Sequence, residues 1–183
     1  MGAGVGWLKD EYDIVGVPFE QRGKIADEII PLLRRLWSEP KISHQGTFFQ
    51  LPAVCFEPKP VQRVAGEKSI PIELGGASKA ALRRAGELGD GWIEIGGNSL
   101  DDIAPRIETI QAHRAKAGRM DLPFEITLSA ALVPDDDAMA RAKAMGVTRL
   151  LTMPPFPEGR FGIELEEALA FVERMGREVI DQE

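Results

Sequence analysis

The chain has 183 residues, of which 44% are hydrophobic and 28% charged, a composition typical of a globular protein large enough to bury one substantial core. No apolar stretch reaches the roughly 18 to 20 residues of a membrane span, and no basic segment followed by an apolar one precedes the first predicted strand. We therefore expect a cytoplasmic protein with no membrane partner. The net charge of −7 disfavours nucleic acid as a partner, because phosphate binding needs a basic surface. The single cysteine, Cys55, excludes intrachain disulfides and is expected to be buried, and with only two histidines we expect no metal site.

The first part of the chain predicts one strand, one long helix and a hairpin. A short apolar run near residues 3–7 indicates the strand. Apolar residues spaced three and four apart predict a helix over about residues 19–37, with a kink at Pro31. Two β-prone runs around a glycine predict a hairpin over residues 41–51, and the proline-rich residues 56–62 predict no regular structure.

From residue 70 onward, predicted strands and helices alternate. The strands are residues 70–75, 91–95, 125–133 and 147–153, and the helices are residues 78–88, 101–117, 135–145 and 163–180. With the N-terminal strand these form five βα units, which indicates an α/β protein with a parallel sheet buried on both faces. The last helix has an apolar face that should cover the sheet. The pattern fits an open doubly wound sheet or the last five eighths of a TIM-type (β/α)8 barrel with a hairpin insertion.

One seven-residue pattern occurs twice, each time at the end of a predicted strand. It is IELGGAS at residues 72–78 and IEIGGNS at residues 93–99. In the first copy Ser78 would cap its helix and no acidic residue follows in the first turn, so free backbone N–H groups and the helix dipole are available to an anion. In the second copy Ser99 and Asp102 form a capping box whose carboxylate would repel a phosphate. The first copy is therefore the candidate anion site.

Charged and aromatic residues near the two copies also bear on function. Six Lys or Arg against three Glu lie between residues 57 and 84, so positive charge surrounds the first copy. Glu73 and Glu94 alternate with apolar neighbours, and each carboxylate would either face a ligand or pair with a Lys or Arg. Trp7 and Trp92 are predicted to pack in the core or at its rim. No residue is predicted as a catalytic acid, base or nucleophile.

A series of stretches follows an order that one protein family shares. They are GVGWLKDEY, GVPFEQRG, LRRLW, GTFF, PKPVQ, IPIELGGAS, ALRRAGELGDGW and the terminal βα units. Together they resemble the luciferase-like monooxygenases, and specifically the branch of oxidoreductases that use the deazaflavin coenzyme F-420. The resemblance covers essentially the whole chain, as a single domain over residues 1–183. It implies a TIM barrel of which this chain corresponds to the C-terminal five eighths, lacking the first three βα units of the family.

The resemblance also implies a coenzyme and a binding site. It implies an oxidoreductase that uses F-420 or FMN to transfer a hydride to a small organic substrate, often as a homodimer. Two loops would hold the phosphate end of the coenzyme. Their residues are Gly4, Val5, Gly6 and Trp7 after the first strand, and Gly75, Gly76, Ala77 and Ser78 in the first Gly-Gly copy. Bacterial luciferase has an arginine at the position of Val5, so here backbone N–H groups, Ser78 and Lys79 or a nearby arginine would bind the phosphate.

Two functions from different classes remain open on the sequence. One is the coenzyme-dependent oxidoreductase or monooxygenase just described. The other is a truncated partial barrel without turnover, which binds coenzyme weakly or serves as an assembly module. In both cases an open five-strand sheet leaves unpaired edges at its first and last strands, so we expect a homodimer or a higher homo-oligomer.

Overall fold

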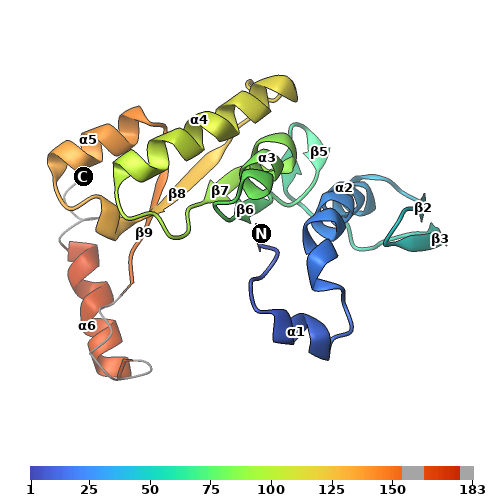
Figure 1. The fold of residues 1–183 in the computed structure, drawn as a ribbon, viewed down its shortest axis with the longest axis horizontal. Helices are drawn as coiled ribbons and strands as arrows, with labels where there is room; N and C mark the ends of the chain where they lie inside the picture. Colours follow the sequence, from blue (N-terminus) through green and yellow to red (C-terminus); the bar gives the residue numbers. More distant parts are fainter. Residues whose placement is uncertain (154–162, 178–183) are drawn as a thin grey trace. The chain divides into compact units, whose positions relative to one another are not determined.

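The computed structural model describes residues 1–153 and 163–177 (Figure 1). The chain divides into two units, Met1–Leu150 and Leu151–Glu183. In the second unit the described helix is α6 (Leu165–Met175), which confirms the predicted terminal helix; residues 178–180 of that prediction lie outside the described residues. The apolar face of α6 is exposed, and its covering of the sheet stays a prediction, as does a single domain over the whole chain.

The first unit is built on a parallel sheet with the strand order β1-β6-β7-β8-β9. The strands are β1 (Gly2–Ala3), β6 (Glu73–Gly75), β7 (Gly91–Ile93), β8 (Glu125–Ser129) and β9 (Arg149–Leu151). Strands that follow one another in the βα series are neighbours throughout, without the reversal of order that defines a doubly wound sheet. The sheet is therefore a partial TIM-type barrel, which settles the choice that the sequence left open.

The helices that connect these strands form one layer. They are α2 (Arg22–Ser38), α3 (Lys79–Leu88), α4 (Leu100–Lys116) and α5 (Asp136–Ala144). Each contacts the next, α2 with α3, α3 with α4 and α4 with α5, as Figure 1 also shows. All four were predicted at nearly these positions, and α2 continues as one helix through Pro31.

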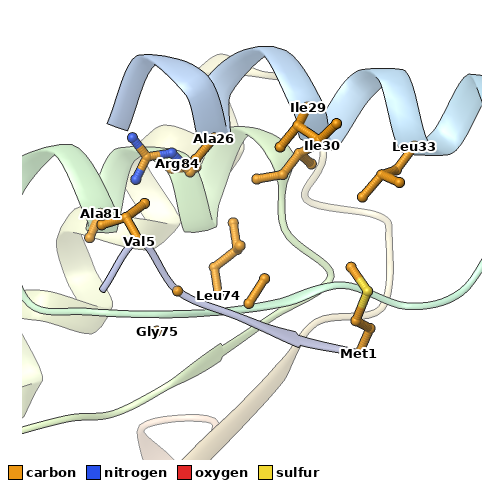
Figure 2. Close-up of a pocket in the computed structure, with 12 residues that line it drawn as sticks. Met1, Val5, Ala26, Ile29, Ile30, Leu33, Leu74, Gly75, Ala81 and Arg84 are labelled. Carbon is orange, nitrogen blue, oxygen red and sulfur yellow. The ribbon is translucent and has the colours of Figure 1, made fainter. Parts of the chain in front are cut away.

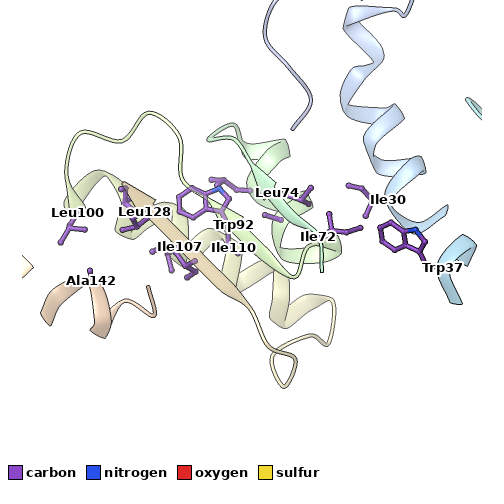
Figure 3. Close-up of a cluster of buried hydrophobic side chains, with 14 residues drawn as sticks. Ile30, Trp37, Ile72, Leu74, Trp92, Leu100, Ile107, Ile110, Leu128 and Ala142 are labelled. Atoms are coloured by element: carbon purple, nitrogen blue, oxygen red, sulfur yellow. The ribbon is translucent and has the colours of Figure 1, made fainter. Parts of the chain in front are cut away.

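The hydrophobic core lies between this helix layer and one face of the sheet (Figure 3). Its largest fully buried side chains are Trp92, Ile72, Ile103, Ile110, Ile126 and Leu128. On β6, Leu74 belongs to this core at 4% exposure, whereas Glu73 and Gly75 point to the opposite face and are partly exposed. The prediction of a sheet buried on both faces is therefore wrong for that second face. A closed barrel fills its inner face with side chains from eight strands, and the described sheet supplies five.

Several short elements differ from the predictions. The predicted hairpin is confirmed as β2 (Ile42–Gln45) and β3 (Gln50–Val54). The prediction missed α1 (Lys9–Ile14) and a small hairpin of β4 (Arg63–Val64) and β5 (Glu67–Lys68). The first turn of the predicted long helix, Phe19–Gln21, is a 3-10 turn, and so is Ala130–Leu132, which was predicted as strand. The first strand ends at Ala3 and β8 ends at Ser129, both earlier than predicted. Cys55 is exposed, because it follows β3 and lies in the irregular segment, so its predicted burial is wrong.

Candidate functional site

The two loops predicted to hold a phosphate leave the sheet at the same edge. β1 and β6 are adjacent and parallel, and Ala3 pairs with Leu74, so the register places Gly4 beside Gly75. Gly4, Val5 and Gly75 line one cavity of about 100 Å³ beside α2 (Figure 2). The fold therefore brings these three predicted residues together. Gly6, Trp7, Gly76, Ala77 and Ser78 lie next to them in the chain but do not line this cavity.

The cavity itself does not suit an anion. Most of its lining is apolar, as Figure 2 shows, from Ala26, Ile29, Ile30 and Leu33 of α2 and from Leu74. Arg84 also lines the cavity, but its Nε and Nη2 already donate to Asp27 and to the Gly23 carbonyl oxygen. A mainly apolar space of this kind offers few hydrogen bonds to replace those that a phosphate makes with water. A phosphate would therefore have to bind at the turns themselves, outside this packing space.

The start of α3 has the open geometry that the sequence predicts. Ser78 is the N-cap, and its Oγ accepts a hydrogen bond from the Ala81 N–H at 3.2 Å. The N–H groups of Lys79 and Ala80 have no acceptor within the helix, because the first turn of any α-helix lacks one. No acidic residue stands in this first turn, and the residues from Ala77 to Ala80 are exposed. The helix start therefore presents backbone donors and a positive dipole end to solvent.

A buried tryptophan fixes the turn before α3. Trp92 is fully buried, as predicted, and its Nε1–H donates to the carbonyl oxygen of Gly76 at 3.0 Å. Gly76 has a φ of 116°, and a Cβ at that position would lie 2.9 Å from the Cβ of Ala81. Only glycine fits this conformation and this space. The sequence pattern contains both glycines but gives no sign of the indole hydrogen bond, which joins residues 16 positions apart.

The loop after β1 is held by the missed helix α1. Tyr12 of that helix donates its hydroxyl hydrogen bond to the carbonyl oxygen of Val5. Gly6 has a φ of 68°, and a Cβ there would lie 3.2 Å from the Tyr12 ring. Trp7 is 84% exposed, so its predicted packing is wrong: within the described part of the chain, nothing covers its ring. The loop is thus ordered by Tyr12 and leaves a large aromatic side chain at the strand edge.

The two arginines of α3 are not available to a ligand. Arg84 donates from Nε to Asp27 Oδ1 at 2.7 Å and from Nη2 to the Gly23 carbonyl oxygen at 2.8 Å. Arg83 donates to Glu87 at 2.6 Å and to Asp27 at 2.7 Å. The Glu87 hydrogen bond raises the pKa of Arg83 against the opposing effect of burial, and Asp27 adds to the rise. The expectation that a nearby arginine binds the phosphate is therefore wrong for Arg83 and Arg84, because Asp27 of α2 is their acidic partner. Lys79 remains as the cationic candidate near this turn.

In the second Gly-Gly copy, side chains of the copy itself and of the helix after it accept hydrogen bonds from the backbone of the turn, as predicted. The carboxylate of Glu94 takes part as well, which was not predicted. Ser99 Oγ accepts the Asp102 N–H at 3.2 Å, and Asp102 Oδ2 accepts the Asn98 N–H at 3.2 Å. Glu94 Oε1 accepts the Gly97 N–H at 2.5 Å and pairs with Arg106 at 3.2 Å. The N–H groups of Gly97 and Asn98 are thus already bonded to carboxylates, whose negative charge lies beside the helix start.

The acidic residues of both copies pair with arginines. Glu94 pairs with Arg106, and Glu73 pairs with Arg149 across the partly exposed face of the sheet. Pairing, the alternative to ligand contact, therefore holds for both residues. Over residues 1–153 and 163–177, no three His, Cys, Asp or Glu side chains are grouped to hold a metal ion. Nor does any helix in those ranges have the length and apolar character to cross a membrane.

Comparison with known sequences adds a family to this geometry. Residues 1–177 match the model of the luciferase-like monooxygenase family. An uncharacterized protein of Mycobacterium tuberculosis (strain ATCC 25618 / H37Rv) is 36% identical over 154 residues, which are 82% of this chain and 50% of the relative. An FMNH(2)-dependent dimethylsulfone monooxygenase of Pseudomonas putida is 29% identical over 89% of this chain and 43% of its own length. The chain thus spans about half the length of these curated relatives.

Solved structures agree in fold. The monooxygenase RslO1 of Streptomyces bottropensis aligns with a TM-score of 0.72 at 14% identity, over 100% of this chain and 68% of that one. The coenzyme F420 dependent tetrahydromethanopterin reductase of Methanopyrus kandleri aligns with a TM-score of 0.69 at 15% identity, over 99% and 73%. The partial barrel, its strand order and the family match over nearly the whole chain lead to one conclusion: the chain belongs to the luciferase-like monooxygenase family.

Proposed function

We propose that this chain binds the phosphate-bearing end of a flavin-type coenzyme, F-420 or FMN, as part of an oxidoreductase that acts on a small organic substrate in the cytoplasm. The observation that carries the proposal is the exposed first turn of α3, which has Ser78 as its N-cap and no acidic residue, beside the loop of β1. The family supports the class of coenzyme, since its relatives and structural neighbours include proteins named for FMNH2 and for coenzyme F420.

The binding chemistry would rest on the backbone. The Gly76 turn brings main-chain atoms close to a ligand without a Cβ in the way, and the N–H groups at the start of α3 point along the helix dipole toward it. Lys79 adds a charge at the same exposed end. Gly4, Val5, Gly6 and Trp7 would form the opposite side, with the Val5 carbonyl held by Tyr12. These features fit a phosphate group.

The reaction itself would depend on the coenzyme. When bound and reduced, a flavin or deazaflavin supplies the hydride. The residues of this chain would bind and orient its phosphate end, and the exposed Trp7 ring would limit access of water at the strand edge. We thus propose that the hydride passes to a small organic substrate.

Titration of the purified protein with F-420 and with FMN tests the proposal. Coenzyme fluorescence should change with a saturating dependence on protein concentration for one of the two. An unchanged signal for both at high micromolar concentration contradicts it.

Ser78→Asp locates the phosphate, and Ser99→Asp is its matched control. Aspartate is a good N-cap, so both variants should fold with unchanged melting temperature. Ser78→Asp places a negative charge at the open helix start and should weaken coenzyme binding roughly tenfold or more. Ser99→Asp lies in the turn already bonded to its own carboxylates and should bind as the wild type does. Equal affinities of the two variants would place the phosphate elsewhere.

One observation favours the second function, a partial barrel without turnover. Glu73 and Glu94 both pair with arginines, so neither carboxylate is a free acid or base at the candidate site. As an assembly module the chain would use its open sheet edges at β1 and β9 to form a homodimer or a higher homo-oligomer. Light scattering over a range of concentrations tests this, and a monomer at all of them contradicts it.

A further inference from the structure

A second cluster of charged residues lies at the opposite end of the strands, on Asp90. This residue precedes β7, and its side chain is 7% exposed. Its Oδ2 accepts the Ile72 N–H at 2.8 Å and Arg34 Nη2 at 2.7 Å, and its Oδ1 accepts Arg119 Nη2 at 3.1 Å. A single carboxylate thus joins α2, the start of β6 and the loop after α4. The cluster is separate from the Gly75–Ser78 turn, which follows β6.

The positive charge of this cluster exceeds its negative charge. Arg34 and Arg119 share Asp90, and a third arginine, Arg114, is 6% exposed and pairs with no carboxylate of the described residues. Arg114 donates to the Gln111 side chain at 2.9 Å and to the carbonyl oxygens of Arg119 and Leu122 at 2.9 and 2.6 Å. Burial lowers the pKa of Arg114, and the charge of Arg119 lowers it further. A buried excess of positive charge is unfavourable unless an anion accompanies it.

A cavity of about 200 Å³ is lined by two of these arginines, Arg34 and Arg119. Lys68, Ser38 and Ser69 complete its polar lining, and Glu67 is the one acidic lining residue among those that the structure describes. The β4–β5 hairpin forms one wall, and Leu122 contributes to another. The lining therefore has three positive charges and one negative charge.

Arg119, which lines this cavity, also has a buried donor without a partner. Its Nη2 binds Asp90 and the Gly89 carbonyl oxygen, but its Nε has no hydrogen-bond partner within the part of the chain that the structure describes. A buried donor on a charged group is costly to leave unpaired, so the positive charge of Arg119 is only partly compensated by the protein.

From this geometry we infer that the cavity between Arg34, Arg119 and Lys68 binds a small oxyanion, either inorganic phosphate or the phosphate of a monoester. Guanidinium groups present planar sets of donors that match phosphate oxygens, and Lys68 at the exposed rim adds a charge. The bound anion would compensate the excess charge around Asp90 and would connect the β4–β5 hairpin to α2 and to the loop after α4.

Calorimetric titration with inorganic phosphate, and in parallel with glycerol phosphate, tests the site at constant ionic strength. We expect saturable binding of at least one, and the tighter of the two identifies the source of the phosphate. Arg119→Lys keeps the charge but removes the planar set of guanidinium donors, and should weaken binding about tenfold. Lys68→Gln leaves the Asp90 contacts intact and should weaken it about threefold. Lys116→Gln, at the exposed end of α4, is the matched control and should bind as the wild type does.

Three outcomes overturn the inference. They are heats no larger than those of chloride at equal ionic strength, wild-type affinity in both Arg119→Lys and Lys68→Gln, or loss of phosphate binding in Ser78→Asp alone. Ser78→Asp should leave this binding unchanged, because its turn follows β6 at the other end of the strand. Failure of the coenzyme site and failure of this site are therefore separate results. Since Lys68 makes no contact with Asp90, its variant remains informative even if Arg119→Lys lowers the melting temperature.

Discussion

The two Gly-Gly copies are nearly identical in sequence, but their turns are held in different ways. In IELGGAS a buried indole, Trp92, holds the turn through the Gly76 carbonyl oxygen, and the helix N–H groups stay open. In IEIGGNS the carboxylates of Glu94 and Asp102 bind the N–H groups of the turn. The carbonyl of the first turn accepts from the indole and its backbone N–H groups stay open, whereas in the second turn carboxylates bind the Gly97 and Asn98 N–H groups and place negative charge beside the helix start. The two copies therefore differ in the donors and in the charge that they present to an anion.

The two copies also differ in the backbone itself. The positive φ falls on the second glycine of the first copy, Gly76, and on the first glycine of the second copy, Gly96. Glycines at matching positions of the two copies thus adopt different backbone conformations. The reason lies in the residues that contact each turn. Trp92 and Ala81 contact the first turn, and Ile103 and Glu94 contact the second.

The largest effect that would sharpen this comparison is expected from Glu94→Ala. Its carboxylate is 3% exposed and binds both the Gly97 N–H and Arg106, so its removal leaves two partly buried partners unpaired and should lower the free energy of unfolding by about 3 kcal/mol. Glu73→Ala is the control, because its partner Arg149 is 47% exposed and such a pair contributes about 1 kcal/mol or less. Urea denaturation measures both, and equal losses would show that the two glutamates have the same role.

A smaller effect should follow Gly76→Ala. Its φ of 116° is strained for alanine, and the new Cβ would meet Ala81 at 2.9 Å. We expect a loss of about 2 to 3 kcal/mol in the free energy of unfolding. Gly96→Ala, with a φ of 78° and nothing within 4 Å of its Cβ, should lose only about 1 kcal/mol. A Gly76→Ala variant as stable as the wild type would contradict the close contact between Gly76 and Ala81.

The smallest change in stability is expected from Ala80→Asp, which gives the first copy the acidic first turn of the second. The helix dipole favours the new charge and helix propensity disfavours it, so the free energy of unfolding should change by less than about 0.5 kcal/mol. Coenzyme fluorescence titration should nevertheless show weaker binding. Asp102→Ala in the second copy should do the reverse, losing stability without a change in affinity. Wild-type affinity in Ala80→Asp would argue against an anion at this helix start.

Local pattern predicted much of the fold and part of the candidate site. The alternation of strands and helices placed α2, α3, α4 and α5 correctly, because an amphipathic helix repeats its apolar positions within a few residues. The caps at Ser78 and Ser99 were predicted for the same reason, since each involves residues three positions apart. The family resemblance added the barrel, which the number of βα units left undecided.

What the sequence left open depends on contacts between distant residues. A nearby arginine was expected as a phosphate ligand, but Asp27, more than 50 positions away, binds both Arg83 and Arg84. Asp90 joins arginines 56 and 29 positions away, and Trp92 reaches back 16 positions to Gly76. Capping and helical periodicity act within a few residues and can be read along the chain. The choice of charge partner, and with it the availability of a site, follows from which elements the fold places side by side.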